Sequence, residues 1–142
     1  MGFSHANLFS ILIAAVAAWI FGGAYYTAFS KPWMAAQGKT LEQCKAEMEA
    51  KSGFAKGAPF VLVFISEIII AWVLYGILLH LNVFTLRAGI ISALFCWFGF
   101  VLTTIATNNA FQGRRVMLTV IDSVAWLGAF VIIGAIIGWW GP

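Results

Sequence analysis

Residues 59–81 read PFVLVFISEIIIAWVLYGILLHL, and Glu67 is the one acidic residue among them. About 20 helical residues cross the roughly 30 Å hydrocarbon core of a bilayer, so this segment is long enough to span a membrane. Three further apolar stretches are of similar length, at residues 8–29, 85–107 and 117–138. Lipid offers the backbone no hydrogen-bond partners, and these runs lack two-residue alternation, so they are predicted to be helices and not barrel strands. The sequence therefore predicts an all-α integral membrane protein, a four-helix transmembrane bundle.

The composition fits this bundle and excludes several other classes of protein. With 142 residues, the chain is predicted to be a single domain. Hydrophobic residues make up 63% and charged residues 9% of the sequence, far from the composition of soluble proteins. The net charge of +3 does not indicate a nucleic-acid partner, because the lysines and arginines sit beside the spans and form no basic helix face. The first apolar run is longer than the core of a signal peptide and lacks a convincing cleavage site, so we expect it to be retained as a span.

The basic residues predict the orientation of the bundle, because positively charged loops stay on the cytoplasmic side of a membrane. The loop between the second and third spans has only Arg87, at its edge. We therefore expect the first and third loops in the cytoplasm and both termini on the periplasmic side of a bacterial inner membrane. The basic residues of those loops are Lys31, Lys39, Lys45, Lys51 and Lys56 in the first, and Arg114 and Arg115 in the third.

The first loop is the one connection long enough to hold structure of its own. Pro32 and Gly38 are expected to break the helix of the first span. Thr40 followed by Gln43 matches a capping box, and apolar residues at helical spacing come after it. Residues 41–52 are therefore predicted to form a short amphipathic helix in this cytoplasmic loop. Its apolar edge rests on lipid or on the bundle in one interpretation, and the helix is a solvated cover in the other.

Small residues recur at the spacing that lets transmembrane helices approach closely. Helices in lipid associate through such faces, because lipid provides no hydrophobic drive between them. These stripes are expected to pack within one chain or between chains, and their number predicts a homo-oligomer or a subunit of a membrane protein complex. They comprise Ala14, Ala18 and Gly22 in the first span, Gly89, Ala93, Cys96, Gly99 and Thr103 in the third, and Ala125, Ala129, Gly134 and Gly138 in the fourth.

Two acidic residues lie within the spans. At about 1.5 Å per residue, Glu67 lies ~12 Å along its helix from the cytoplasmic end and Asp122 ~9 Å along its own. A charged carboxylate at the centre of a span costs about 2.5–3.5 kcal/mol, so we expect each to be protonated, paired or turned toward water. Their similar depth predicts a shared polar site in the cytoplasmic half of the bundle. The other residues expected to contribute are Tyr25, Tyr26, Thr104, Asn108, Asn109, Arg114 and Arg115.

Three interpretations of this polar cluster stay open. In the first, the carboxyls are hydrogen-bonded contacts between helices. In the second, the site binds a membrane lipid headgroup or a small anion, with arginines contacting the anion and asparagines as orienting amides. In the third, the cluster belongs to a small oligomeric proton-coupled transporter or channel, although the outer half has almost no polar residues to continue a path. No Ser/His/Asp arrangement or phosphate-binding loop is present, and Cys44 and Cys96 lack metal-ligand spacing, so no enzyme activity, metal or cofactor is expected.

Several of these residues stand in short motifs that occur in a familiar order. Residues 23–26 read GAYY, residues 29–33 FSKPW, residues 108–114 NNAFQGR and residues 134–139 GAIIGW. Over nearly its whole length the sequence resembles a bacterial membrane protein family, domain of unknown function 1761. The resemblance implies a small four-span protein of the bacterial inner membrane, and it implies no activity. The motifs gather at the predicted cytoplasmic ends of spans one, three and four, which favours a shared site there.

Overall fold

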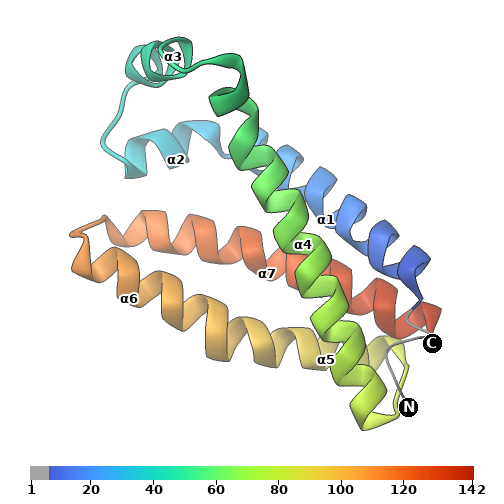
Figure 1. Ribbon diagram of the computed structural model, residues 1–142. Helices are drawn as coiled ribbons and strands as arrows, with labels where there is room; N and C mark the ends of the chain where they lie inside the picture. The colour runs from blue at the N-terminus through green and yellow to red at the C-terminus, as the bar shows by residue number, and fades with distance from the viewer. Residues whose placement is uncertain (1–6) are drawn as a thin grey trace.

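The computed structural model describes residues 7–142. Residues 1–6, and with them the predicted periplasmic position of the amino terminus, lie outside that range. Every regular element in the described range is a helix, and four helical segments are long and apolar enough to cross a bilayer (Figure 1). The prediction of an all-α transmembrane bundle is confirmed, and the chain is a multi-pass membrane protein. The spans are α1 (Leu8–Ala28), α4 (Gly53–Leu81), the continuous run of α5 (Leu86–Cys96), the π-helix η2 (Trp97–Leu102) and α6 (Thr103–Phe111), and α7 (Val116–Trp140).

Three of these spans extend beyond their predicted bounds, α7 by only one or two residues at each end, and local residues explain the two larger differences. α4 begins at Gly53 and not at Pro59, because the hydroxyl of Ser52 accepts a first-turn backbone N–H at 3.4 Å and caps the helix. The third span continues to Phe111 and ends just before Gly113. With a φ of +65°, this glycine adopts the left-handed conformation that terminates helices and that side chains disfavour.

The small-residue faces of α5 and α7 pack against each other within the chain. A Cβ atom added to Gly89 would lie 1.9 Å from the carbonyl oxygen of Gly134 and 3.0 Å from Cα of Gly138. The two backbones are therefore in direct contact, which only glycine permits at these positions. The stripe in the other half of the third span differs, because a Cβ on Gly99 would meet nothing within 4 Å. Part of the predicted stripe thus packs internally, and part faces outward.

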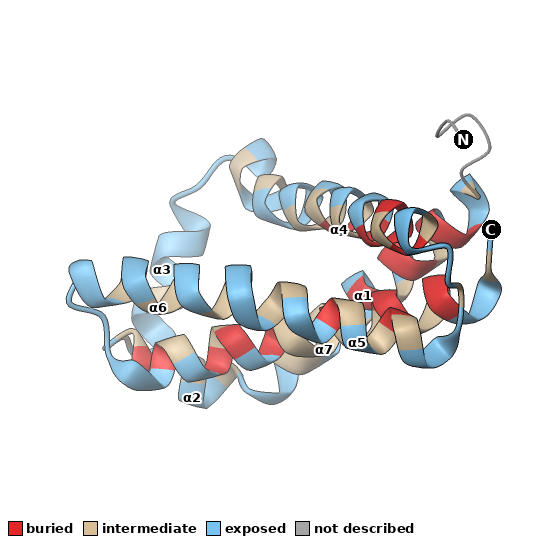
Figure 2. Cartoon of the chain, turned by 90° about the horizontal axis from the view of Figure 1, so that it is seen from below, coloured by how far each residue is buried: buried red, intermediate tan, exposed pale blue. Residues whose placement is uncertain are grey.

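Buried residues gather in two places, a main core toward the end of the bundle where α4 meets α5 and a smaller cluster near the start of α7 (Figure 2). The amino-terminal half of α4 diverges from α7, and Phe54 and Leu62 are 88% and 64% exposed (Figure 1). This half stays attached to α1, where Nε1 of Trp19 donates to the carbonyl oxygen of Phe60 at 3.1 Å. The smaller cluster comprises Ala36, Leu118 and Ile121, with Tyr25, Tyr26 and Trp33 packed against it.

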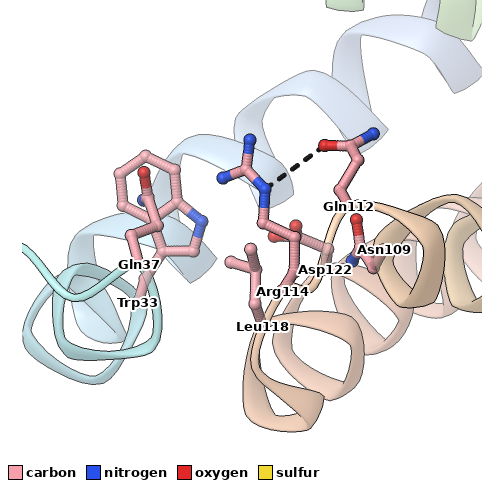
Figure 3. A pocket seen from close by; sticks show the side chains of 7 residues that line it. All are labelled: Trp33, Gln37, Asn109, Gln112, Arg114, Leu118 and Asp122. Atoms are coloured by element: carbon pink, nitrogen blue, oxygen red, sulfur yellow. Dashed lines mark hydrogen bonds between the residues drawn. The ribbon is translucent and has the colours of Figure 1, made fainter.

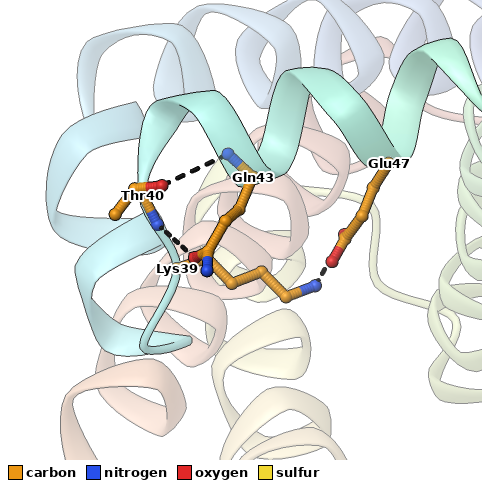
Figure 4. A network of polar contacts seen from close by, with 4 residues as sticks. All are labelled: Lys39, Thr40, Gln43 and Glu47. Atoms are coloured by element: carbon orange, nitrogen blue, oxygen red, sulfur yellow. Dashed lines mark hydrogen bonds and ion pairs between the residues drawn. The ribbon is translucent and has the colours of Figure 1, made fainter.

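The first loop contains two helices, α2 (Ser30–Ala36) and α3 (Leu41–Glu49), where the sequence predicted one. α2 was not predicted, because Pro32 was interpreted as a helix breaker. Pro32 in fact lies in the first turn of α2, where a backbone N–H has no intrahelical partner and its absence costs no hydrogen bond. The predicted capping box is confirmed, with Gln43 N donating to Thr40 Oγ1 at 3.2 Å and Thr40 N donating to Gln43 Oε1 at 2.9 Å (Figure 4). α3 is shorter than the predicted 41–52, since the chain turns there to begin α4.

Candidate functional site

A cavity of about 240 Å³ opens where α2 meets the turn between α6 and α7. One wall comes from α2 and the residue after it, the opposite wall from the end of α6 and the turn, and α7 completes the cavity between them (Figure 3). The amino-terminal end of α7, where Leu118 lines the cavity, carries the positive end of the helix dipole and favours a negative group nearby. The lining residues are Trp33, Gln37, Asn109, Gln112, Arg114, Leu118 and Asp122.

Hydrogen bonds to backbone oxygens hold α1 and α2 against this end of α7. Nη1 of Arg115 donates to the carbonyl oxygen of Ala35 at 2.6 Å, which ties the end of α2 to the α6–α7 turn. The hydroxyl of Tyr25 donates to the carbonyl oxygen of Ile121 at 2.8 Å. Arg115 and Tyr25 were both predicted site residues, but neither lines the cavity. They support its walls instead.

Asp122 supplies the negative charge of the cavity. Its Oδ1 accepts a hydrogen bond from the hydroxyl of Tyr26 at 2.7 Å, and the Tyr26 ring contacts Trp33 edge-on with centroids 5.7 Å apart. Within residues 7–142 the one ion pair joins Lys39 to Glu47 on the α3 surface, so no basic side chain neutralises Asp122. A carboxylate accepts several hydrogen bonds, and Tyr26 occupies one oxygen. The other oxygen can receive a donor from a ligand.

Side chains with donor groups line the same cavity. Nε2 of Gln37 is buried and has no hydrogen-bond partner in the described part of the chain. Nε of Arg114 donates to Oε1 of Gln112 at 3.3 Å, which uses one of the five N–H donors of the guanidinium (Figure 3). Nδ2 of Asn109 donates to Oγ1 of Thr119 at 3.1 Å, and this bond fixes the orientation of the amide. The cavity therefore combines a positive group, a negative group and a donor without a partner.

Glu67 does not line this cavity, although the sequence predicted a site shared with Asp122. It is 2% exposed within α4, and its Oε2 has no hydrogen-bond partner among the described residues. The two carboxyls are separated because α4 diverges from the amino-terminal end of α7 and stays against α1 (Figure 1). Matching depth along two helices does not ensure that two side chains face each other.

Two other predicted residues lie elsewhere. Thr104 donates to the carbonyl oxygen of Phe100 in its own helix, and it lines a second, mostly apolar cavity of about 270 Å³. Asn108 is exposed on α6 and lines neither cavity. That second cavity is lined by Ile70, Phe100, Val101, Thr104, Ile105, Trp126 and Phe130. Of the predicted site residues, the structure thus brings Asn109, Arg114 and Asp122 into the first cavity, with Tyr26 bonded to Asp122.

Sequence reasoning missed four lining residues, Trp33, Gln37, Gln112 and Leu118. Trp33 was interpreted as an interfacial anchor, yet it ends the FSKPW motif, and Gln112 lies within the NNAFQGR motif together with two of the predicted residues. Those motifs were a signal that could have found both. Gln37 and Leu118 have no comparable signal, because only the packing of α2 on α7 brings them to the cavity.

The comparisons with known proteins identify one match. The model of a protein family described as "Protein of unknown function (DUF1761)" matches residues 9–138. No curated protein and no solved structure matches the chain. The matched region includes every residue that lines the cavity, so the cavity lies wholly within the part that the family model describes. Within residues 7–142, no group of three or more His, Cys, Asp or Glu side chains comes together that could hold a metal ion.

Proposed function

We propose, since the chain belongs to the DUF1761 family of proteins of unknown function, that it is a non-enzymatic membrane protein whose cavity between α2, α6 and α7 binds a lipid headgroup or small anion. The observation that carries this proposal is Arg114 at the cavity wall, whose guanidinium donates to Gln112 through Nε alone among the described residues and keeps its other donors for a ligand. A hydrogen bond from a guanidinium to a phosphate or carboxylate is roughly twice as strong as one between neutral groups.

The charge at the cavity supports the same ligand class. The guanidinium of Arg114 presents a planar set of donors that fits the oxygens of a phosphate or carboxylate. The positive end of the α7 helix dipole lies at the same place, since Leu118 of its first turn lines the cavity. A ligand without an anionic group would gain less from either feature.

The location of the cavity favours a ligand drawn from the membrane surface. The cavity lies in the half of the bundle that adjoins the lysine-rich first loop and the arginines of the third. The charge of those loops supports a cytoplasmic location, with both termini on the periplasmic side of a bacterial inner membrane. There the positive residues meet anionic and zwitterionic phospholipid headgroups.

The lining residues do not favour catalysis. The seven side chains include no Ser, Thr, Cys or His that could act as a nucleophile or a base beside Asp122. Tyr26 holds one oxygen of that carboxylate, and nothing in the cavity forms a chain from nucleophile to base to orienting group. A binding role needs none of these parts.

Arg114→Ala should abolish ligand retention, because it removes the positive charge from the cavity. The measurement is native mass spectrometry of protein purified in a mild detergent, which detects lipids and small anions that stay bound. Arg87→Ala is the matched control, since Arg87 is an exposed arginine at the other end of the third span. Equal retention by both variants, or no bound species on the wild-type protein, would overturn the proposal.

We also propose that the chain self-associates, with the third span as the contact. Of the 18 most apolar consecutive residues in α7, 44% are buried within the chain, and the corresponding share in the third span is 11%. Gly99 and Thr103 are exposed on it, at a spacing that lets a second copy approach closely. Association as a subunit of a larger membrane complex would use the same face.

Gly99→Leu should shift the protein to smaller species in mild detergent, because a bulky side chain would separate the two copies. Size-exclusion chromatography with light scattering measures this change. Gly22→Leu is the control, since a Cβ on Gly22 also meets nothing within 4 Å and α1 is not the proposed contact. An identical mass for the wild type and both variants would exclude the third span as the interface.

A further inference from the structure

Two opposite charges line the same cavity without forming an ion pair. Arg114 donates to Gln112, and Asp122 accepts from Tyr26. The one ion pair within residues 7–142 lies elsewhere, on the α3 surface. A simple anion bound by Arg114 would therefore lie in a small cavity beside an uncompensated carboxylate. The Asp122 carboxylate would repel that anion, so an anion alone satisfies Arg114 and leaves Asp122 without a partner of opposite charge.

We propose that the ligand is a phosphate ester that carries a primary ammonium group, the chemistry of phosphoethanolamine. This inference rests on the proposed function and specifies its ligand. The phosphate oxygens accept from the guanidinium of Arg114, which lines the cavity. The ammonium donates to the oxygen of Asp122 that Tyr26 leaves unoccupied. Both charged groups of the cavity are then satisfied by one ligand.

The carboxylate selects a primary ammonium over a quaternary one. A primary ammonium has N–H groups that can donate to Asp122, and a quaternary ammonium has none. Trp33 lines the same cavity, and an indole ring attracts either cation through its face. The hydrogen bond to Asp122, and not the aromatic ring, therefore discriminates between the two headgroups.

The size of the cavity and its surroundings favour a lipid over a free ester. A volume of about 240 Å³ lies below the roughly 300–1,000 Å³ of pockets that enclose drug-sized ligands, so it accommodates a headgroup but not acyl chains. Large apolar side chains beside it are open to the bilayer, with Phe111 90% and Val116 79% exposed. These side chains flank the α6–α7 turn that carries Gln112 and Arg114, where acyl chains would leave the cavity.

The test is headgroup competition on the purified full-length wild-type protein. Native mass spectrometry in a mild detergent would compare phosphatidylethanolamine, phosphatidylcholine and phosphatidylglycerol of identical acyl chains, with free phosphoethanolamine and inorganic phosphate as soluble probes. We expect phosphatidylethanolamine to bind at least about tenfold more tightly than the other two lipids, since one charge-assisted hydrogen bond distinguishes them. Binding of free phosphoethanolamine as tight as that of the lipid would identify the soluble ester as the ligand and overturn the lipid assignment.

Asp122→Asn should reduce binding of phosphatidylethanolamine to the level of phosphatidylcholine and leave phosphatidylglycerol unchanged or tighter. Glu49→Gln, at the exposed end of α3, is the matched control and should retain the preference. The wild-type comparison stays decisive if Asp122→Asn does not fold. A wild-type protein that binds phosphatidylglycerol as well as phosphatidylethanolamine would overturn this inference and leave the proposed function standing. Absence of binding to every probe would overturn both.

Discussion

The Gly89→Ala substitution should lower the free energy of unfolding by about 3 kcal/mol or more, the upper end of the range for overpacked sites. The added Cβ would lie 1.9 Å from the carbonyl oxygen of Gly134 and 3.0 Å from Cα of Gly138. These atoms belong to the backbone and cannot rotate away, so α5 and α7 would have to separate along their contact. Equilibrium unfolding in mixed detergent micelles, followed by circular dichroism, measures the change.

Gly22→Ala provides the matched control, because a Cβ there meets nothing within 4 Å and α1 is not the proposed contact between copies. Alanine favours a helix over glycine by about 1 kcal/mol, so this variant should be unchanged or slightly more stable. Equal stability of the two variants would show that α5 and α7 do not approach as closely as the structure has them. Gly134→Ala should behave like Gly89→Ala, since its Cβ would lie 2.4 Å from the carbonyl oxygen of Gly89.

Glu67→Met should raise the free energy of unfolding by about 1–3 kcal/mol, the cost of burying a polar group without a partner. Glu67 is 2% exposed, and its Oε2 receives no hydrogen bond from the described residues. Methionine has a similar length and no polar oxygen, so it keeps the packing of α4 and removes the unsatisfied atom. The same unfolding experiment in detergent detects the gain.

Glu67→Gln is the appropriate comparison for this second prediction. The amide keeps the size of the side chain and still buries polar atoms, so the stability of this variant should lie closer to that of the wild type than to that of Glu67→Met. A loss of stability in Glu67→Met would contradict the prediction. It would mean that the carboxyl makes a stabilising contact in the folded protein.

The structure keeps some of the predicted site residues together and not others, and the reason is physical. Asn109 and Arg114 belong to one short motif at the turn between two antiparallel spans, so a sequence reading places them together without knowledge of the packing. Asp122 and Glu67 were joined only by their depth along separate helices. Depth follows from the rise per residue, but the direction of each side chain depends on how α4 and α7 are rotated and tilted.

The sequence by itself determined the all-α class, the four spans, the capping box at Thr40 and the family, because each depends on composition or on residues close together in the chain. Only the tertiary structure decided that Gly89 meets Gly134 within one molecule and that Gln37 and Asp122 line one cavity. These contacts depend on the angles and rotations at which whole helices pack. In lipid those angles are set by close contacts between distant segments, which no local pattern encodes.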